Sequence, residues 1–222
     1  MATGTRELTF LLAAPERRLL EAIARRLPRW VTSDLLTALG VAGALITAAG
    51  YALSGRSTLW LLVACAGLGI NWFGDSLDGT VARVRRLERP KYGYYLDHVV
   101  DVFSTAVVGV GIGLSPYMGL EIALGLVALY LALSINVYLE TAVFDVFRLG
   151  YGPFGPTESR VILVIWNLGV VGATAAGLDL TGALSTVIDA VGILLGVGMA
   201  AIMATRFVRN LRELARLEPA RR

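Results

Sequence analysis

Six apolar segments, each long enough to cross a membrane, constrain the fold of this chain more than any other feature of its sequence. A helix needs roughly 20 residues to cross the hydrocarbon core of a bilayer, which is about 30 Å thick. With 56% hydrophobic and 17% charged residues, the chain is also far more apolar than a soluble domain. We therefore predict an all-α integral membrane protein with six transmembrane helices. The expected spans are Ser33–Leu53, Leu59–Val84, Tyr92–Leu114, Tyr117–Phe144, Arg160–Leu178 and Leu184–Thr205.

These spans divide the chain into three parts. We expect residues 1–32 to form an N-terminal cytoplasmic or interfacial segment, residues 33–205 a six-helix domain, and residues 206–222 a basic cytoplasmic tail. In the first part, Pro15–Leu27 places four apolar side chains on one helical stripe and its arginines elsewhere, which predicts an interfacial amphipathic helix. A cytoplasmic helix packed on another soluble element is the alternative. The stripe consists of Leu19, Leu20, Ile23 and Leu27.

The basic residues predict the orientation, because cytoplasmic segments retain Lys and Arg. The N-terminal segment, the second connection, the fourth connection and the C-terminus hold all of them except Arg56. Both termini should therefore be cytoplasmic. The second connection, which joins the second and third spans, should lie on the same side. We expect the membrane to be a prokaryotic cytoplasmic membrane. Cys65 is the only cysteine and lies in an apolar run, so no disulfide framework or cysteine-based metal site is expected.

Four aspartates lie in two of the expected spans, where carboxylates are costly and usually functional. Asp75 and Asp78 are three residues apart, and Asp97 and Asp101 are four apart, so each pair faces one side of its helix. Two such helices packed together bring four acidic groups into one pocket. Four anions at such distances repel one another strongly unless cations join them. The sequence therefore predicts a divalent metal site.

Two further residues indicate what the metal site acts on. Gly79 follows Asp78 and has no side chain, so a bulky ligand can approach the backbone there. Arg83 lies one turn further on, and its guanidinium offers planar, bidentate donors to phosphate oxygens. Acids for metals and an arginine for phosphate indicate metal-assisted phosphoryl transfer.

The complete pattern resembles the signature of the CDP-alcohol phosphotransferase (CDP-alcohol phosphatidyltransferase) family, D-x-x-D-G-x-x-A-R, eight or nine residues, then G-x-x-x-D-x-x-x-D. The six-span layout and the N-terminal helix extend the resemblance to nearly the whole chain. Every fixed position of the signature is present, as Asp75, Asp78, Gly79, Ala82, Arg83, Gly93, Asp97 and Asp101.

The resemblance implies a site for two divalent cations, Mg²⁺ or Mn²⁺. Asp75, Asp78 and Asp97 would ligate them, with Asp101 either a fourth ligand or the base that takes the proton of the acceptor hydroxyl. Asp97 and Asp101 are thus the expected catalytic residues. The CDP-alcohol would rest its diphosphate on the metals and Arg83, and attack by the acceptor on the β-phosphorus would expel CMP. The residues implied for binding this substrate are Asp78, Gly79, Ala82 and Arg83.

By the same resemblance, we expect a phospholipid synthase that transfers a phosphatidyl-type group from a CDP-linked lipid, such as CDP-diacylglycerol, to a small polar alcohol. The alternative is a transferase that moves the headgroup of CDP-choline or CDP-ethanolamine to diacylglycerol. A divalent-cation transporter is the rival of another class, but it leaves Gly79, Ala82 and Arg83 unexplained. We expect no nucleic-acid partner. A homodimer is expected from the family and from glycines of the third and sixth spans, Gly109, Gly111, Gly113, Gly192, Gly196 and Gly198.

Three residues are candidates for the acceptor pocket, and each has a simpler alternative. Arg160 either contacts the acceptor or anchors its helix at the membrane surface. Glu140 either faces the pocket or bonds Asn136, one turn away. His98 is a proton relay or metal contact, or else it bonds a carboxylate or faces a neighbouring helix. Its Asp-His dipeptide is similar to that of the choline and ethanolamine branch.

A basic cluster and the fourth connection also bear on the pocket. An acceptor that carries a phosphate should require a second basic cluster, to which Arg148, Arg160 and Arg206 are the plausible contributors. The fourth connection, Asp145–Ser159, is rich in Gly and Pro, so we expect a loop near the aspartates.

At the start of the first span, Ser33 or Asp34 should cap the helix, because either side chain satisfies free helix amides.

Overall fold

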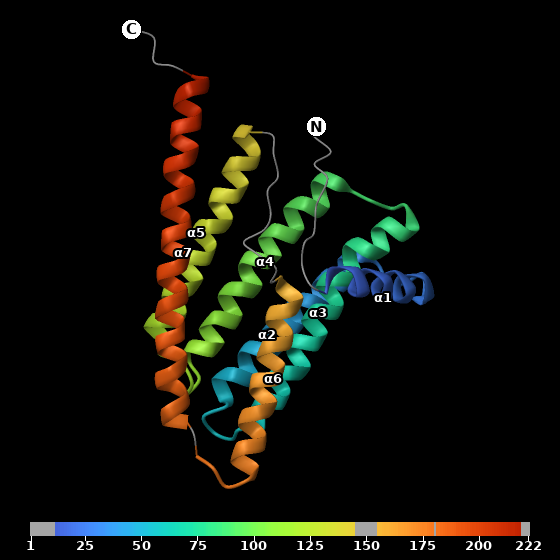
Figure 1. Cartoon of the computed structure of the whole chain (residues 1–222). Helices are drawn as coiled ribbons and strands as arrows, with labels where there is room; N and C mark the ends of the chain where they lie inside the picture. The colour runs from blue at the N-terminus through green and yellow to red at the C-terminus, as the bar shows by residue number, and fades with distance from the viewer. Residues whose placement is uncertain (1–11, 145–154, 180, 219–222) are drawn as a thin grey trace.

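The structure is a computed structural model that describes residues 12–144, 155–179 and 181–218. Within these residues the chain forms seven helices and no strand (Figure 1). The six helices from α2 to α7 are each long and apolar enough to cross a membrane, which confirms the predicted six-span fold. The helices are α1 (Ala13–Arg26), α2 (Ser33–Leu53), α3 (Trp60–Arg85), α4 (Pro90–Gly113), α5 (Leu120–Phe144), α6 (Pro156–Ala175) and α7 (Thr181–Leu217).

The start of α2 is capped by Thr32, and not by Ser33 or Asp34 as expected. The Thr32 hydroxyl accepts a hydrogen bond from the backbone N–H of Leu35 at 3.2 Å. Ser33 instead donates to the carbonyl oxygen of Asp78 at 2.9 Å, and Asp34 forms an ion pair with Arg89. Both polar side chains therefore join α2 to the region of the aspartates, which leaves the cap to their neighbour.

Helix α6 begins at Pro156, four residues before the expected start of the fifth span. Proline is well suited to the first turn of a helix, where its missing N–H costs nothing. Glu158 closes that turn by accepting a hydrogen bond from the backbone N–H of Gly155 at 2.9 Å. The expected loop over Asp145–Ser159 was therefore wrong for its last four residues, and positions 145–154 lie outside the described residues.

The last helix, α7, is much longer than its expected span. It has 37 residues and a length of about 56 Å, nearly twice the roughly 30 Å hydrocarbon core. The residues expected to begin a separate tail at position 206 therefore continue the helix as far as Leu217. Figure 1 shows the C-terminal part of α7 extending past the other helices. At the opposite end, the backbone N–H of Thr181 lowers the pKa of Asp179 by donating to its carboxylate at 3.1 Å.

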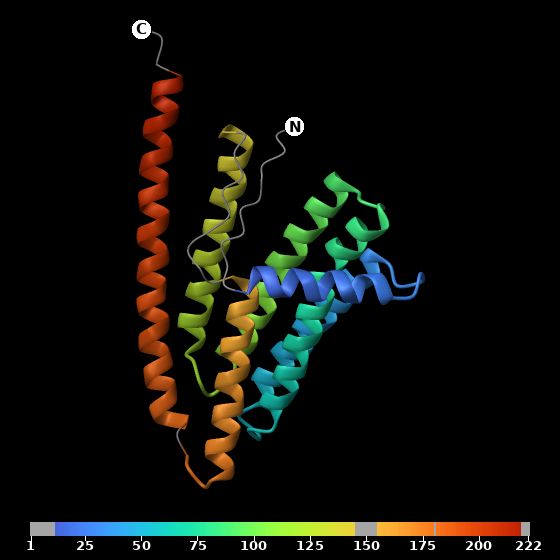
Figure 2. The ribbon, with the colours of Figure 1, turned by 45° about the vertical axis from the view of Figure 1, so that its right-hand side comes forward.

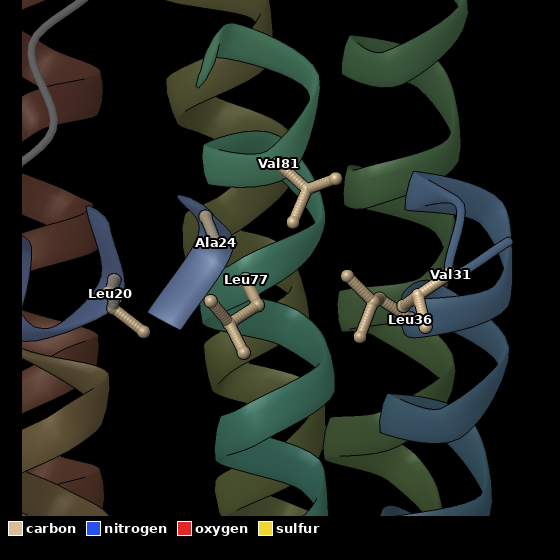
Figure 3. Packing of buried hydrophobic residues seen from close by; sticks show 6 residues of the cluster. All are labelled: Leu20, Ala24, Val31, Leu36, Leu77 and Val81. Atoms are coloured by element: carbon tan, nitrogen blue, oxygen red, sulfur yellow. The ribbon is translucent and has the colours of Figure 1, made fainter. Parts of the chain in front are cut away.

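Helix α1 lies across the bundle and is fixed on α3 (Figure 2). Leu20 and Ala24 of α1 pack in a buried cluster with Leu77 and Val81 of α3, together with Val31 and Leu36 (Figure 3). The guanidinium of Arg85, in the last turn of α3, donates to four carbonyl oxygens beyond the end of α1. These acceptors are Leu27 at 3.0 Å, Pro28 at 2.9 Å, Arg29 at 3.5 Å and Val31 at 2.6 Å. The apolar stripe of α1 thus faces the protein at Leu20, Ile23 and Leu27, whereas Leu19 is exposed.

Glycines bring α2 and α3 into backbone contact. A Cβ atom at Gly43 would lie 2.3 Å from the backbone nitrogen of Asn71, and one at Gly74 would lie 2.4 Å from that of Gly40. Neither position has space for a side chain. Because Gly74 precedes Asp75 in the chain, this close packing fixes the part of α3 that carries the first aspartate.

The glycines of α4 and α7 that were expected to favour a dimer mostly face helices of the same chain. A Cβ at Gly111 would lie 2.5 Å from the backbone of Ala48, and one at Gly192 would lie 2.8 Å from the side chain of Ile122. Gly113 likewise faces Leu120 and Ala123. The homodimer stays a prediction, but these glycines do not support it.

Candidate functional site

Three of the four predicted aspartates converge between α3 and α4, which both pack against α2. One carboxylate oxygen from each of Asp75, Asp97 and Asp101 lies within 4.8 Å of the others. Asp75 comes from α3, whereas Asp97 and Asp101 are one turn apart on α4. The helical spacing thus orients each side chain, and the packing of both α3 and α4 against α2 brings them together.

Asp78 lies beside this group, and its carboxylate is held by α2. Its Oδ2 accepts a hydrogen bond from the Thr37 hydroxyl at 2.6 Å, while its Oδ1 accepts from the N–H of Gly79. Asp78 also lines a narrow cavity with Asp75 and Asp97. All four predicted acids are therefore in one region, three as a tight cluster and the fourth at its edge.

Arg160 is bound directly to this cluster. Its Nη2 donates to Asp75 Oδ2 at 2.6 Å, and its Nε donates to the amide oxygen of Asn71 at 3.1 Å. Asn71 and Asp75 are one turn apart on α3, so the flat guanidinium bridges two positions on one helix face. The start of α6 thus supplies a positive charge at the carboxylate that the sequence assigned to a metal.

The site fits a hard divalent cation. Carboxylate oxygens are the ligands that Mg²⁺ and Mn²⁺ favour, and here three of them come from two helices. The cavity that Asp75, Asp78 and Asp97 line has a volume of about 10 Å³, room for one water-sized species. The guanidinium of Arg160 balances part of the negative charge at Asp75.

Arg83 lies one helical turn after Gly79 on α3, on the same face of the helix. A Cβ at Gly79 would lie 3.2 Å from Arg83 Nη1, so the guanidinium lies over the position that has no side chain. Arg83 Nη2 also donates to the hydroxyl of Thr80 at 3.0 Å, and the arginine is exposed, with Ala82 half-buried beside it. At Gly93, in contrast, a Cβ would meet no atom of the described residues within 4 Å. Close packing within the chain therefore does not require that glycine.

His98 lies in an aromatic stack beside the cluster. Its ring centroid is 4.1 Å from that of Tyr94 and 4.6 Å from that of Tyr138 on α5. Its Nδ1 lies 3.5 Å from a carboxylate oxygen of Asp97. The histidine thus faces both a neighbouring helix and an acidic residue of the site.

Glu140 takes part in a polar contact between α5 and α7. It forms an ion pair with Arg206 and accepts hydrogen bonds at 2.6 Å from the side-chain amides of Asn136 and Asn210. The side chains of Glu140 and Arg206 are only 10% and 12% exposed. The carboxylate of Glu140 is therefore surrounded by donors from its own helix and from α7.

Sequence reasoning missed Thr37 and Asn71, which contact Asp78 and Arg160. Their positions carried a weak signal, since Asn71 is one turn before Asp75 and Thr37 is one turn after Ser33. Neither spacing indicates which helices become neighbours. Arg148, the remaining member of the predicted basic cluster, lies outside the described residues.

Comparisons with known proteins show the family of the chain. The model of the CDP-alcohol phosphatidyltransferase family matches residues 30–197. An archaetidylinositol phosphate synthase from Methanothermobacter thermautotrophicus is 34% identical over 120 residues, which make up 54% of this chain and 56% of the relative. The matched part thus spans about half the length of this curated relative.

Proposed function

The chain belongs to the CDP-alcohol phosphatidyltransferase family, and on that premise we propose that it transfers a phosphatidyl-type group from a CDP-linked lipid to a small polar alcohol, with release of CMP. The observation that carries the proposal is the convergence of Asp75, Asp97 and Asp101, in a chain whose arginine at position 83 lies over Gly79. Together they offer oxygen ligands for cations and a bidentate donor for a diphosphate.

Two Mg²⁺ or Mn²⁺ ions would be held by Asp75, Asp78, Asp97 and Asp101. Bound cations would stabilise the negative charge of the leaving phosphate and lessen the repulsion among the four carboxylates. The hydroxyl of Thr37 keeps the carboxylate of Asp78 turned toward α2, since it donates to Oδ2. Each aspartate is therefore assigned to binding, and Asp101 is also assigned to proton transfer.

The CDP part of the donor would bind along the exposed face of α3. Gly79 adds no side chain to this face, Ala82 adds little bulk one turn along, and Arg83, whose guanidinium lies over Gly79, would turn its nitrogens to the diphosphate. Arg83 is exposed and its described hydrogen bond is to the neutral hydroxyl of Thr80. Its charge is therefore available to a phosphate more readily than that of Arg160, which is bound to Asp75.

The transfer step makes one bond and breaks another at the β-phosphorus. The acceptor oxygen forms a bond to this phosphorus while the bond to the bridging oxygen breaks, and CMP leaves with that electron pair. The proton of the acceptor hydroxyl passes to the carboxylate of Asp101. Asp101 suits this task because it is close to Asp75 and Asp97 without being bound to Arg160 in the way that Asp75 is.

We propose that the acceptor enters beside Arg160. This residue contacts the cluster from α6, on a different helix from Arg83, so donor and acceptor would meet the aspartates from different helices. The name of the relative, an archaetidylinositol phosphate synthase, favours an acceptor with a phosphate. Arg160 is then the first basic contact for that phosphate. His98 and Glu140 stay predictions for the same pocket.

The site and both termini are proposed to face the cytoplasm. The start of α6, the connection between α3 and α4 and the C-terminal end of α7 lie toward one end of the bundle, while the connection between α2 and α3 lies at the other (Figure 1). Arg56 belongs to that opposite connection. The separation of Arg56 from the basic residues at the ends of α3, α6 and α7 supports this orientation.

The test is to supply purified protein with Mg²⁺ or Mn²⁺, CDP-diacylglycerol and a panel of polar alcohols, with and without a phosphate, and to follow CMP and the lipid formed. We expect CMP release only when an acceptor is present. A parallel reaction with CDP-ethanolamine and diacylglycerol tests the alternative donor. Product from this pair alone would reverse the donor assignment, while no product from either donor would contradict the proposal.

A further inference from the structure

Glu16 of α1 joins the two helices that carry Asp75 and Arg160. A single oxygen of its carboxylate, Oε1, accepts hydrogen bonds from the indole N–H of Trp72 at 2.7 Å and from the hydroxyl of Thr157 at 2.7 Å. The hydroxyl of Ser76 lies 3.4 Å from the same oxygen. Trp72 and Ser76 are on α3 and Thr157 is on α6, so one carboxylate binds both helices.

These contacts lie next to the candidate site in the chain. Ser76 follows Asp75, and Trp72 is three residues before it, while Thr157 is one helical turn before Arg160. The helices α3 and α6 are thus joined twice at the same level. One connection is direct, from Arg160 to Asp75 and Asn71, and the other runs through Glu16.

A second contact fixes the start of α6 to α1. Glu158 Oε1 accepts a hydrogen bond from the backbone N–H of Leu12 at 2.8 Å, and its Oε2 accepts from the N–H of Gly155 at 2.9 Å. Glu158 is 6% exposed. The first turn of α6 is therefore held by α1 at Thr157 and at Glu158, on either side of one peptide bond.

We propose that Glu16 is a positioning residue, which holds the first turn of α6, and with it Arg160, against Asp75. A carboxylate is suited to this task, because hydrogen bonds to an ionised acceptor are shorter and stronger than those to a neutral one. Helix α1 lies outside the cluster of acids and supplies none of its ligands. The helix predicted only to rest at the membrane interface thereby gains a role in the geometry of the site.

The inference rests on the proposed metal site, but its test does not require transfer. Arg160 and a bound cation compete for Asp75, so the affinity for Mn²⁺, measured by electron paramagnetic resonance without CDP substrate, reports where Arg160 lies. We expect Glu16→Gln to strengthen Mn²⁺ binding about three- to tenfold, the size of coupling expected within one hydrogen-bond network. Arg160→Ala should strengthen it at least as much, and adding Glu16→Gln to Arg160→Ala should change it no further.

Two other variants separate positioning from folding. Glu21→Gln is the matched control, because Glu21 is on the same helix and its described partner is Arg17, also on α1. It should leave Mn²⁺ affinity unchanged. Thr157→Val removes one hydroxyl and keeps the shape, so it should act like Glu16→Gln, and it replaces that variant if Glu16→Gln does not fold. If transfer is found, the KM for the acceptor should rise in both variants while that for the CDP donor does not.

Two outcomes would overturn the inference. One is unchanged Mn²⁺ affinity in both Glu16→Gln and Thr157→Val. The other is an equal effect of Glu16→Gln with and without Arg160, because a residue that acts through Arg160 has no effect once that side chain is gone. A protein that binds Mn²⁺ as expected but transfers nothing would refute the proposed function and leave the positioning role intact.

Discussion

The helices around the aspartates and the outer pair, α5 and α7, are packed by different kinds of contact. Between α2 and α3, backbone meets backbone at Gly43 and Gly74, with no space for even a methyl group. Between α5 and α7, the glycines of α7 at positions 192 and 196 face flexible side chains, and a buried polar group around Glu140 and Arg206 joins the two helices. Figure 1 shows α7 beside α5, at the edge of the bundle.

The difference follows from what each region has to hold. Metal ligands need their oxygens within a few ångströms, and helices in backbone contact at glycines have little freedom to slide. In the outer pair, a buried charge needs a partner in the apolar surroundings, so Glu140 and Arg206 fix the two helices at one level.

Replacing Asp75, Asp78 or Asp97 by Asn should lower the rate of transfer about 10³-fold or more, while the protein stays folded. Each change removes a metal ligand but also lessens repulsion among the carboxylates. The measurements are CMP release and a thermal unfolding midpoint in detergent. Excess chelator should act in the same way on the unaltered protein. Near-normal release in any of these variants, or in chelator, would count against the metal site.

Glu140→Ala should lower stability by about 3–5 kcal/mol, because it leaves Arg206 buried without its carboxylate. The double variant Glu140→Leu, Arg206→Met should lie close to the starting stability, since it removes both charges and keeps the volume. The measurement is the unfolding of the unaltered protein, the single variant and the double variant in denaturing detergent. Full transfer by the double variant would mean that Glu140 and Arg206 do not contribute to the acceptor pocket. Loss of transfer with normal stability would mean that they do.

Arg83→Ala should weaken binding of the CDP substrate by roughly 10- to 100-fold, the effect of losing charged hydrogen bonds worth about 1.5–3 kcal/mol. Arg83→Lys should be almost as harmful, because a point charge cannot reproduce a bidentate contact. Calorimetric titration with a CDP substrate measures both. Arg85→Lys is a useful companion, since Arg85 donates to backbone carbonyls and should affect stability before binding. Unaltered affinity in Arg83→Ala would refute its assigned role.

Gly43→Ala should cost about 1–3 kcal/mol of stability, because the new methyl group would meet the backbone of Asn71. Gly196→Ala, in α7, should change stability by less than about 0.5 kcal/mol, since its nearest neighbour is a leucine methyl group 3.5 Å away. Comparison of the two unfolding midpoints tests the contrast directly. Equal effects at both positions would mean that the two regions are packed alike.

The sequence was sufficient for features that depend on local spacing. The six spans follow from the length of the apolar segments, and Ser33–Leu53 was predicted to the residue. The pairing of Asp75 with Asp78, and of Asp97 with Asp101, follows from the 3.6-residue helical period. The family also followed from the sequence, because its signature lies within two short segments and all eight positions are present.

Contacts between segments far apart in the chain were decided by the tertiary structure. Glu16 lies 141 residues from Thr157, and Arg160 lies 85 from Asp75, and no periodicity connects such positions. The capping of α2 by Thr32 belongs to the same class, because Ser33 and Asp34 were taken by partners on other elements. Local spacing determines which way a side chain points from its own helix. Only the packing of the helices determines what it meets there.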